Sequence, residues 1–307
     1  MATLPLPPAD PEHIRRVAFL GTPPIAVPTL SAMADAGYEI PLVISGPDRR
    51  RGRGRDKSPT AVKAAALDRG IAVSDDVEDL LSLHKTDPID LAIVVAFGQI
   101  IRRHVLEEIP MVNIHFSALP RWRGAAPVER AILEGDTETA VGVMSIVEAL
   151  DEGDIWASVA VPITPSDTLT GLWETMSQIG AELMIATMQA GFSNPTPQVG
   201  EPLYAHKIST EDRRIDWNRN AEHIGRIVRV GGAWTQFNSE RYKVHEVEIV
   251  EHSGTPGMIQ DLIVGTGSGG VRLLSVQPAG KPRMDAQAWA NGVQPDGASF
   301  DHEQSNG

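Results

Sequence analysis

Three polar side chains in the middle of the chain have types and spacing suited to proton transfer and carbonyl activation. Asn113 and His115 stand two residues apart in the short apolar segment Met111–His115, which predicts a β-strand. Residues two apart on a strand lie on the same face, about 6 to 7 Å from each other, so both side chains would project into one cleft. Asp151 follows in a turn that contains Gly153, and its carboxylate could orient the histidine or accept a proton. An amide that stabilises an oxyanion, beside a histidine that moves protons, would support attack on a carbonyl carbon.

The same residues also have a purely structural interpretation. Asn and His side chains at the ends of strands often satisfy backbone hydrogen-bonding groups. The spacing of Asn113 and His115 is compatible with either role, so a reactive role needs support from the rest of the chain.

Several common reaction classes lack their residues in this chain. There is no cysteine, no Gly-x-Ser-x-Gly nucleophile motif and no Walker loop, so acyl-enzyme and nucleotide chemistry have neither a nucleophile nor a phosphate cradle in the expected place. Residues 21–24, Gly-Thr-Pro-Pro, differ from the GxGxxG pattern, and their prolines would hinder close approach of a dinucleotide. The sequence therefore favours direct transfer of a group between two bound substrates.

Alternating strand and helix patterns place the three polar residues at the carboxyl ends of strands. A chain of 307 residues has about the size of two domains. Its first 190 residues predict an α/β fold, a doubly wound Rossmann-type and mostly parallel sheet, which binds ligands beyond the carboxyl ends of its strands. The expected strands are residues 15–20, 39–45, 71–73, 91–97, 111–115, 140–147 and 156–163. The expected helices are residues 25–36, 58–69 with Ser58 as N-cap, 125–133 and 168–190.

The pattern changes from residue 191 onward. Residues 191–212 begin with an aperiodic, proline-containing stretch and are expected to form a linker. Residues 213–307 hold one helical segment, 221–230, and short strand patterns at 234–237, 242–250, 258–262 and 271–276. Glycine-rich turns separate these strands. The pattern predicts a small β-rich domain, with a β-barrel as its candidate architecture. The polar stretch from residue 291 to the end is expected to be disordered.

Positive charge is concentrated in one short segment. Residues 48–57, DRRRGRGRDK, hold six Lys or Arg against two Asp, a net +4, which leaves −17 for the rest of a chain whose net charge is −13. The contrast predicts one dedicated anionic contact, although a charge run is also typical of a solvated loop. The N-terminus has no basic start or apolar core of a signal peptide, and no apolar run reaches about 18 residues. We therefore expect a soluble, cytoplasmic protein.

Several motifs, taken together, resemble one known family. NIHFSALPRWRGAAPVERAI followed by LDEGD is similar to the formyltransferase family that uses 10-formyltetrahydrofolate. The similarity continues in the same order through AFLGTPP, GPDRRRGRGRDKSPTAVK, VVAFGQIIRRHVLE, YAHKISTEDRRIDW and LLSVQPAGKPRM, and only the two tails lie outside it. The resemblance implies a catalytic domain in residues 1–190 and an OB-like β-barrel that contacts RNA in residues 213–307.

The resemblance also implies a role for individual residues. Asn113, His115 and Asp151 match the catalytic residues of the family, and no metal is implied. Ala118 stands where the family has a leucine in its folate-contacting segment, which removes side-chain volume beside that pocket. The residues that match the two folate-binding regions are Ser117, Ala118, Leu119 and Pro120, and then Phe97, Gly98 and Ile100.

The reaction implied by the resemblance is formyl transfer from 10-formyltetrahydrofolate to the free α-amine of methionine on initiator methionyl-tRNA, with no obligate protein partner. The basic segment, residues 46–57, matches the family's insertion at the acceptor end of tRNA. The residues expected to contact tRNA are Arg49, Arg50, Arg51, Arg53, Arg55, Lys57 and Lys207.

Two alternatives to this function remain open. One is a formyltransferase for a small amine, such as a sugar nucleotide, and the other is a non-catalytic RNA-binding protein with the same fold. The basic segment and the second domain favour tRNA as the acceptor. The intact Asn113, His115 and Asp151 positions count against a non-catalytic protein.

Overall fold

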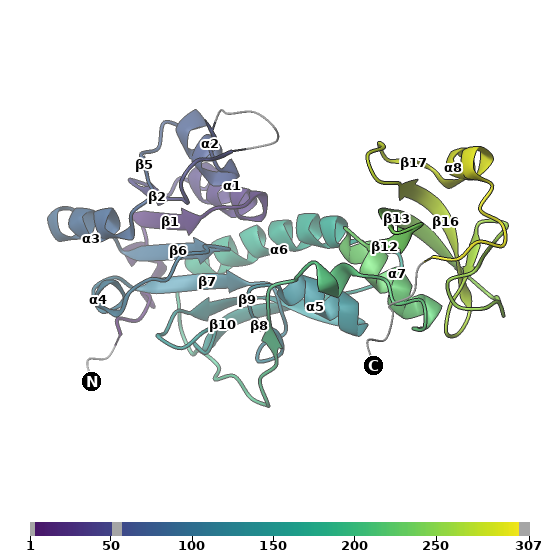
Figure 1. Ribbon diagram of the computed structural model, residues 1–307. Helices are drawn as coiled ribbons and strands as arrows, with labels where there is room; N and C mark the ends of the chain where they lie inside the picture. Colours follow the sequence, from purple (N-terminus) through teal and green to yellow (C-terminus); the bar gives the residue numbers. More distant parts are fainter. Residues whose placement is uncertain (1–3, 51–56, 301–307) are drawn as a thin grey trace. The chain divides into compact units, whose positions relative to one another are not determined.

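The computed structural model describes residues 4–50 and 57–300. These residues form two compact units (Figure 1). Unit 1 comprises Met1–Pro127, Glu138–Pro162 and Trp173–Ala205, and unit 2 comprises Val128–Thr137, Ile163–Leu172 and His206–Gly307. None of the helices within the described ranges is both long enough and apolar enough to cross a membrane.

Unit 1 is built on a mostly parallel seven-stranded sheet, as the sequence predicted. The strand order is β10-β9-β7-β6-β1-β2-β5, and the strands from β7 to β5 run parallel to one another. Strand β9 pairs antiparallel with β7, and β10 pairs antiparallel with β9. All five residues of β1 and of β6 are buried, because helices cover both faces of a central parallel strand. The strand bounds are β1 (Val17–Gly21), β2 (Val43–Ile44), β5 (Val73–Ser74), β6 (Leu91–Val95), β7 (Met111–His115), β9 (Glu138–Ser145) and β10 (Ile155–Pro162).

The helices of the α/β pattern pack on both faces of this sheet. On one face, apolar side chains of α3 and the segment after α4 form a core with Leu20 and Val94 of β1 and β6. On the other face, α6 approaches β7 and β9 at Gly180, where an added Cβ would lie 3.1 Å from Ile114 Cγ2. The bounds are α1 (Val27–Asp35), α2 (Ala61–Asp68), α3 (Val77–Thr86), α4 (Arg103–Leu106) and α6 (Leu169–Ala190), with short 3-10 turns η1 (Pro11–His13) and η2 (Pro24–Ala26).

The start of α2 differs from the expectation that Ser58 caps this helix. Thr60 is the N-cap, and its Oγ1 accepts a hydrogen bond of 3.1 Å from Lys63 N. Ser58 instead lies in β4 (Lys57–Ser58), which pairs antiparallel with β3 (Arg49–Arg50). Pairing with β3 keeps Ser58 in extended backbone, so the helix starts later than the sequence pattern indicated.

The strands β3 and β4 form the base of the basic segment. Arg51, Arg53 and Arg55 lie outside the described residues. The base is anchored to the sheet side by Ser45 Oγ, 2.6 Å from Thr60 Oγ1, and by an ion pair of 2.7 Å between Lys63 Nζ and Asp48 Oδ1. The ends of the segment are therefore tied to the α/β unit.

Unit 2 is organised around an antiparallel sheet with the order β12-β13-β16-β15-β14, to which β17 adds by pairing with β16. Among the described residues the pairings do not join β12 to β14, so the sheet is open by this criterion. The strand bounds are β12 (Trp234–Phe237), β13 (Glu240–Val250), β14 (Ile259–Gln260), β15 (Ile263–Gly265), β16 (Gly270–Gln277) and β17 (Met284–Asp285). The helix bounds are α5 (Pro127–Glu134), most of which belongs to this unit, α7 (Ala221–Val230) and α8 (Ala286–Val293), with η3 (Glu211–Arg213).

The expectation of disorder from residue 291 was wrong for residues 291–300. Asn291 to Val293 end α8, and Phe300 is fully buried. The Phe300 ring stacks on Trp217 with 5.0 Å between centroids, which supplies apolar burial that the surrounding polar residues do not suggest. Residues 301–307, also expected to be disordered, lie outside the described residues.

Candidate active site

Asn113 and His115 lie on β7, near the middle of the unit 1 sheet. Asn113 pairs in register with Val94 of β6 on one side and with Met144 of β9 on the other. The His115 side chain is 6% exposed, whereas Asn113 is partly exposed. Positions two apart on a strand share a face, so the structure places both side chains on one side of β7, as the sequence predicted.

The imidazole of His115 faces two hydrogen-bond acceptors. Its Nε2 lies 2.9 Å from the main-chain oxygen of Trp122, and its Nδ1 lies 3.7 Å from Asp151 Oδ2. A carbonyl oxygen only accepts, so Nε2 carries a hydrogen and donates it to Trp122 O. The contact to Asp151 is longer than a hydrogen bond, but the carboxylate is placed to balance the positive charge of a ring protonated on both nitrogens.

Asp151 sits in a tight turn that its surroundings hold in place. Its φ is +52°, in the left-handed region, and its Oδ2 accepts a hydrogen bond of 2.8 Å from Gly124 N. Gly153 is required by the same turn, because an added Cβ would lie 1.9 Å from the main-chain oxygen of Ser145. The glycine that the sequence placed beside Asp151 is thus a condition for the turn to pack on the end of β9.

A partly buried polar network around Arg123 supports this turn. The Arg123 side chain is 10% exposed, and its Nη1 donates to Glu152 Oε1 at 2.8 Å. Its Nε and Nη2 donate to Gln198 Oε1 at 3.0 and 2.8 Å. Gln198 Nε2 in turn donates to the main-chain oxygens of Asp151 and Gly153, both at 2.8 Å.

The sequence did not identify Gln198 or the main-chain oxygen of Trp122 as parts of the site. Gln198 is 47 residues from Asp151, in a segment expected to be a linker. A backbone oxygen carries no residue-type signal at all. The one available hint was Arg123, because an arginine between apolar and glycine residues is buried only with partners.

The expected folate-contacting segment follows directly after β7. Ser117 is buried, and its Oγ donates to the main-chain oxygen of Arg121 at 2.7 Å, so the hydroxyl folds the loop. Ala118 is exposed, and the Leu119–Pro120 peptide bond is cis. The segment therefore presents Ala118 and its neighbouring backbone at the surface beside the end of β7.

The second expected folate region follows β6, the strand next to β7. Phe97 packs partly against the core below the sheet edge. Gly98 is exposed, and Ile100 is 91% exposed. Because β6 and β7 are parallel neighbours, their following loops leave the same edge of the sheet.

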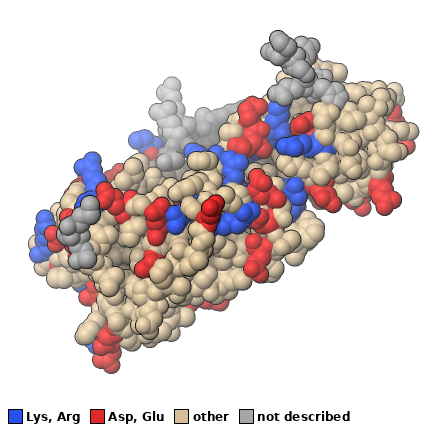
Figure 2. Space-filling model, turned by 90° about the horizontal axis from the view of Figure 1, so that it is seen from below, with Lys and Arg blue, Asp and Glu red and all other residues tan. Residues whose placement is uncertain are grey.

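The residues expected to contact tRNA are placed only in part. Arg49 and Arg50 form β3, Lys57 is exposed on β4 in unit 1, and Lys207 is exposed in unit 2. Figure 2 shows positive and negative side chains interspersed over the face that it presents. Across the described ranges, no three His, Asp or Glu side chains gather as a metal site needs.

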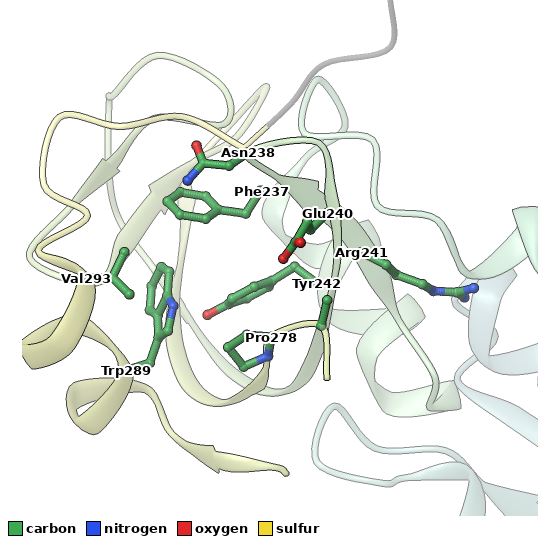
Figure 3. A pocket seen from close by; sticks show the side chains of 9 residues that line it. Phe237, Asn238, Glu240, Arg241, Tyr242, Pro278, Trp289 and Val293 are labelled. Atoms are coloured by element: carbon green, nitrogen blue, oxygen red, sulfur yellow. The ribbon is translucent and has the colours of Figure 1, made fainter. Parts of the chain in front are cut away.

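Unit 2 contains a separate, aromatic pocket (Figure 3). It has a volume of about 180 Å³, and Phe237, Tyr242 and Trp289 are among the residues that line it. The rings of Tyr242 and Trp289 are tilted by 58° to each other with 5.0 Å between centroids, while the Arg241 side chain extends away from them. The Tyr242 hydroxyl is buried without a hydrogen-bond partner in the described part of the chain, and burial raises its pKa. None of the expected site residues lines this pocket.

Comparison with known proteins places the chain in a family. Residues 15–188 match the model of the formyl transferase family, and residues 207–294 match that of the formyl transferase C-terminal domain. The methionyl-tRNA formyltransferase of Corynebacterium aurimucosum is 39% identical over 314 residues, covering 91% of this chain and 94% of that protein.

Two solved structures share the fold. The methionyl-tRNA formyltransferase from Clostridium thermocellum, 15% identical, covers 76% of this chain and 93% of its own, with a TM-score of 0.58. An N-formyltransferase from Helicobacter canadensis, solved with folinic acid and dTDP-3-aminofucose, is 17% identical and covers 88% of this chain and 100% of its own, with a TM-score of 0.65. The chain therefore belongs to the formyl transferase family, in the group of its methionyl-tRNA formyltransferase relatives.

Proposed function

We propose that this protein transfers the formyl group of 10-formyltetrahydrofolate to the α-amino group of methionine on initiator methionyl-tRNA. The observation that carries the proposal is the close approach of His115 and Asp151, 3.7 Å apart at the end of β7, in a member of this family. Identity of 39% to a methionyl-tRNA formyltransferase over nearly the whole chain supports tRNA as the acceptor.

The chemistry assigned to the three polar residues follows from their positions. The methionyl nitrogen forms a bond to the formyl carbon, and the carbonyl electron pair moves to the oxygen. Asn113 would donate a hydrogen bond to this oxyanion, the positive charge of protonated His115 would stabilise it, and Asp151 would balance the charge on His115. When the bond from the carbon to N10 breaks, N10 keeps the electron pair and gains a proton. That proton balances the one lost by the attacking nitrogen, which Asp151 or water would remove.

The loops after β6 and β7 are the proposed folate site. They leave neighbouring strands at the same edge of the sheet, which is where doubly wound folds bind ligands. Ala118 is exposed there, and its small side chain leaves more room beside the co-substrate than a leucine would. Ser117, buried and bonded to Arg121 O, would shape this loop.

The remaining parts of the proposal concern the roles of the domains, the contact with tRNA and the cellular location of the protein. Residues 1–190 would form the catalytic domain, 191–212 a linker and 213–307 a domain that contacts RNA. The basic segment at 46–57 would meet the acceptor end of tRNA, because arginines bind phosphates and stack on exposed bases. A role in translation initiation would place the protein in the cytoplasm.

A competition among acceptors tests this proposal. Purified protein receives 10-formyltetrahydrofolate with methionyl initiator tRNA, free methionine or an amino-sugar nucleotide, the ligand class in the Helicobacter canadensis structure. Formylmethionine is measured after hydrolysis of the tRNA ester. We expect product with the charged tRNA and none with free methionine. Efficient formylation of the sugar amine alone would overturn the proposed acceptor, and tRNA binding without any transfer would overturn the proposed activity.

A further inference from the structure

The side-chain amide of Gln198 forms four hydrogen bonds around the Asp151 turn. Its Nε2 donates to Asp151 O and Gly153 O at 2.8 Å each, and its Oε1 accepts from Arg123 Nε and Nη2 at 3.0 and 2.8 Å. Both hydrogens and both lone pairs of the amide are therefore used. Such a fully satisfied group specifies one geometry strongly.

The orientation of this amide follows from the chemistry of its neighbours. The Arg123 guanidinium only donates, whereas the main-chain oxygens of Asp151 and Gly153 only accept. A reversed amide would place NH2 against the guanidinium and an oxygen against two carbonyls. The amide of Gln198 therefore has a single favourable orientation. A glutamate at this position would keep the contacts to Arg123, but its second carboxylate oxygen would repel the main-chain oxygens of the turn.

The Asp151 turn requires support of this kind. A left-handed backbone is unfavourable at a residue other than glycine, so outside contacts must hold it. The carboxylate is held by Gly124 N, and the main chain is held by Gln198. The segment carrying Gln198 is itself fixed to β10, because Thr196 and Ile155 exchange two backbone hydrogen bonds of 2.8 and 2.9 Å.

From this geometry we propose that Gln198 is a positioning residue for formyl transfer: it fixes the Asp151 turn so that the Asp151 carboxylate stays against His115. The inference rests on the proposed function. Arg123 orients Gln198 from behind, and Glu152 balances the charge of Arg123. Residues 196–198 therefore belong to the reaction site through the turn that they hold, although they lie far from it in the sequence.

The variant Gln198→Glu tests the proposal with a change of one atom type. We expect kcat to fall by about tenfold to a hundredfold, the range for losing a group that orients a reactive one. The KM values for tRNA and folate should stay as in the unchanged protein, because Gln198 is assigned no substrate contact. Gln178→Glu is the matched control, since Gln178 is exposed on α6 and carries the same change of charge. A kcat for Gln198→Glu equal to that of the control would overturn the proposal.

A double-mutant cycle separates positioning from a general structural effect. In an Asp151→Asn background the catalytic carboxylate is already absent, so Gln198→Glu should lower kcat little further. Equal losses in both backgrounds would show that Gln198 acts independently of Asp151 and would contradict the inference. If Gln198→Glu does not fold, Gln198→Ala replaces it, since it removes the four hydrogen bonds without adding charge.

Crystal structures of the unchanged protein and of Gln198→Glu give a readout that does not need activity. We expect the distance between His115 Nδ1 and Asp151 Oδ2 to be clearly longer in the variant than in the unchanged protein. An unmoved turn in the variant would overturn the positioning role. Absence of formyl transfer by the unchanged protein, together with a displaced turn in the variant, would overturn only the proposed function.

Discussion

The Asp151 turn of unit 1 and the aromatic pocket of unit 2 differ in whether their polar groups have hydrogen-bond partners. At the turn, the guanidinium of Arg123, the amide of Gln198 and the main-chain oxygens of Asp151 and Gly153 all have partners. In the pocket, the hydroxyl of Tyr242 has none within the described residues, and three other aromatic rings contact the ring of Tyr242. Orienting a charged group requires hydrogen bonds, whereas packing rings requires only apolar contact. The first arrangement is suited to chemistry and the second to stability.

In the comparison of the turn with the pocket, the largest expected effect comes from the charge of Asp151. Asp151→Asn keeps an oxygen for the hydrogen bond from Gly124 N but removes the partner charge of His115. We expect kcat to fall by about 10² to 10⁴-fold, the contribution typical of acid–base groups, with the thermal midpoint nearly unchanged. Single-turnover formylation measures the first quantity and calorimetry the second. A variant with normal kcat and a lowered midpoint would assign the turn a structural role instead.

Loss of a ring from the aromatic pocket should act on stability alone. Trp289 is buried, and its ring lies 5.4 Å from that of Phe237. Trp289→Ala should lower the free energy of unfolding by about 3 to 5 kcal/mol, as expected for a large cavity, and leave kcat per folded molecule unchanged. Urea titration measures the free energy of unfolding. Trp173→Ala is the control, because Trp173 is 39% exposed. A similar loss in both variants would argue against a core role for the pocket.

A smaller effect is expected from the hydroxyl of Tyr242. Tyr242→Phe removes a buried donor that has no partner within the described residues and keeps the ring contacts. The free energy of unfolding should stay within about 1 kcal/mol of its original value and change in the stabilising direction, because no hydrogen bond is lost. Urea titration is again the measurement. A loss well above this range would mean that the hydroxyl has a partner and that the contrast with the Asp151 turn is weaker.

The smallest effect concerns Glu129 of α5. Burial raises the pKa of Glu129. A backbone hydrogen bond and the charges of Arg213 and Arg130 lower this pKa, but burial has the larger effect. A carboxyl with a raised folded-state pKa stabilises the fold below its unfolded-state pKa, and this contribution is lost as pH rises through the folded-state value. Glu129→Gln should therefore increase the free energy of unfolding at neutral pH, with the gain vanishing in acid. Urea titrations at several pH values measure this, and a loss of stability at neutral pH would contradict it.

The sequence predicted most elements with strong periodicity or clear boundaries. Strand β7 and helix α7 were expected at residues 111–115 and 221–230, where the structure has them. The apolar run of β7 and the amphipathic pattern of α7 are local signals, and Asn220 caps α7 by accepting from His223 N at 2.8 Å. The placement of Asn113 and His115 on one face followed directly from the strand.

Features that depend on distant contacts could not be predicted. Gln198 lies in an aperiodic stretch, and only the fold brings it to the turn at Asp151. Helix α8 and the burial of Phe300 were missed because a single aromatic in a polar stretch gives no periodic signal. Trp122 contributes to the site through a main-chain oxygen, which every residue type possesses.

The account depends most on His115 as the group that acts on the formyl oxygen. The direct test is single-turnover formylation of methionyl initiator tRNA by His115→Ala, with tRNA binding measured on the same preparation. We predict that transfer falls to the background rate while the affinity for tRNA is retained. Transfer at an unchanged rate would contradict the assignment of the reaction to the end of β7.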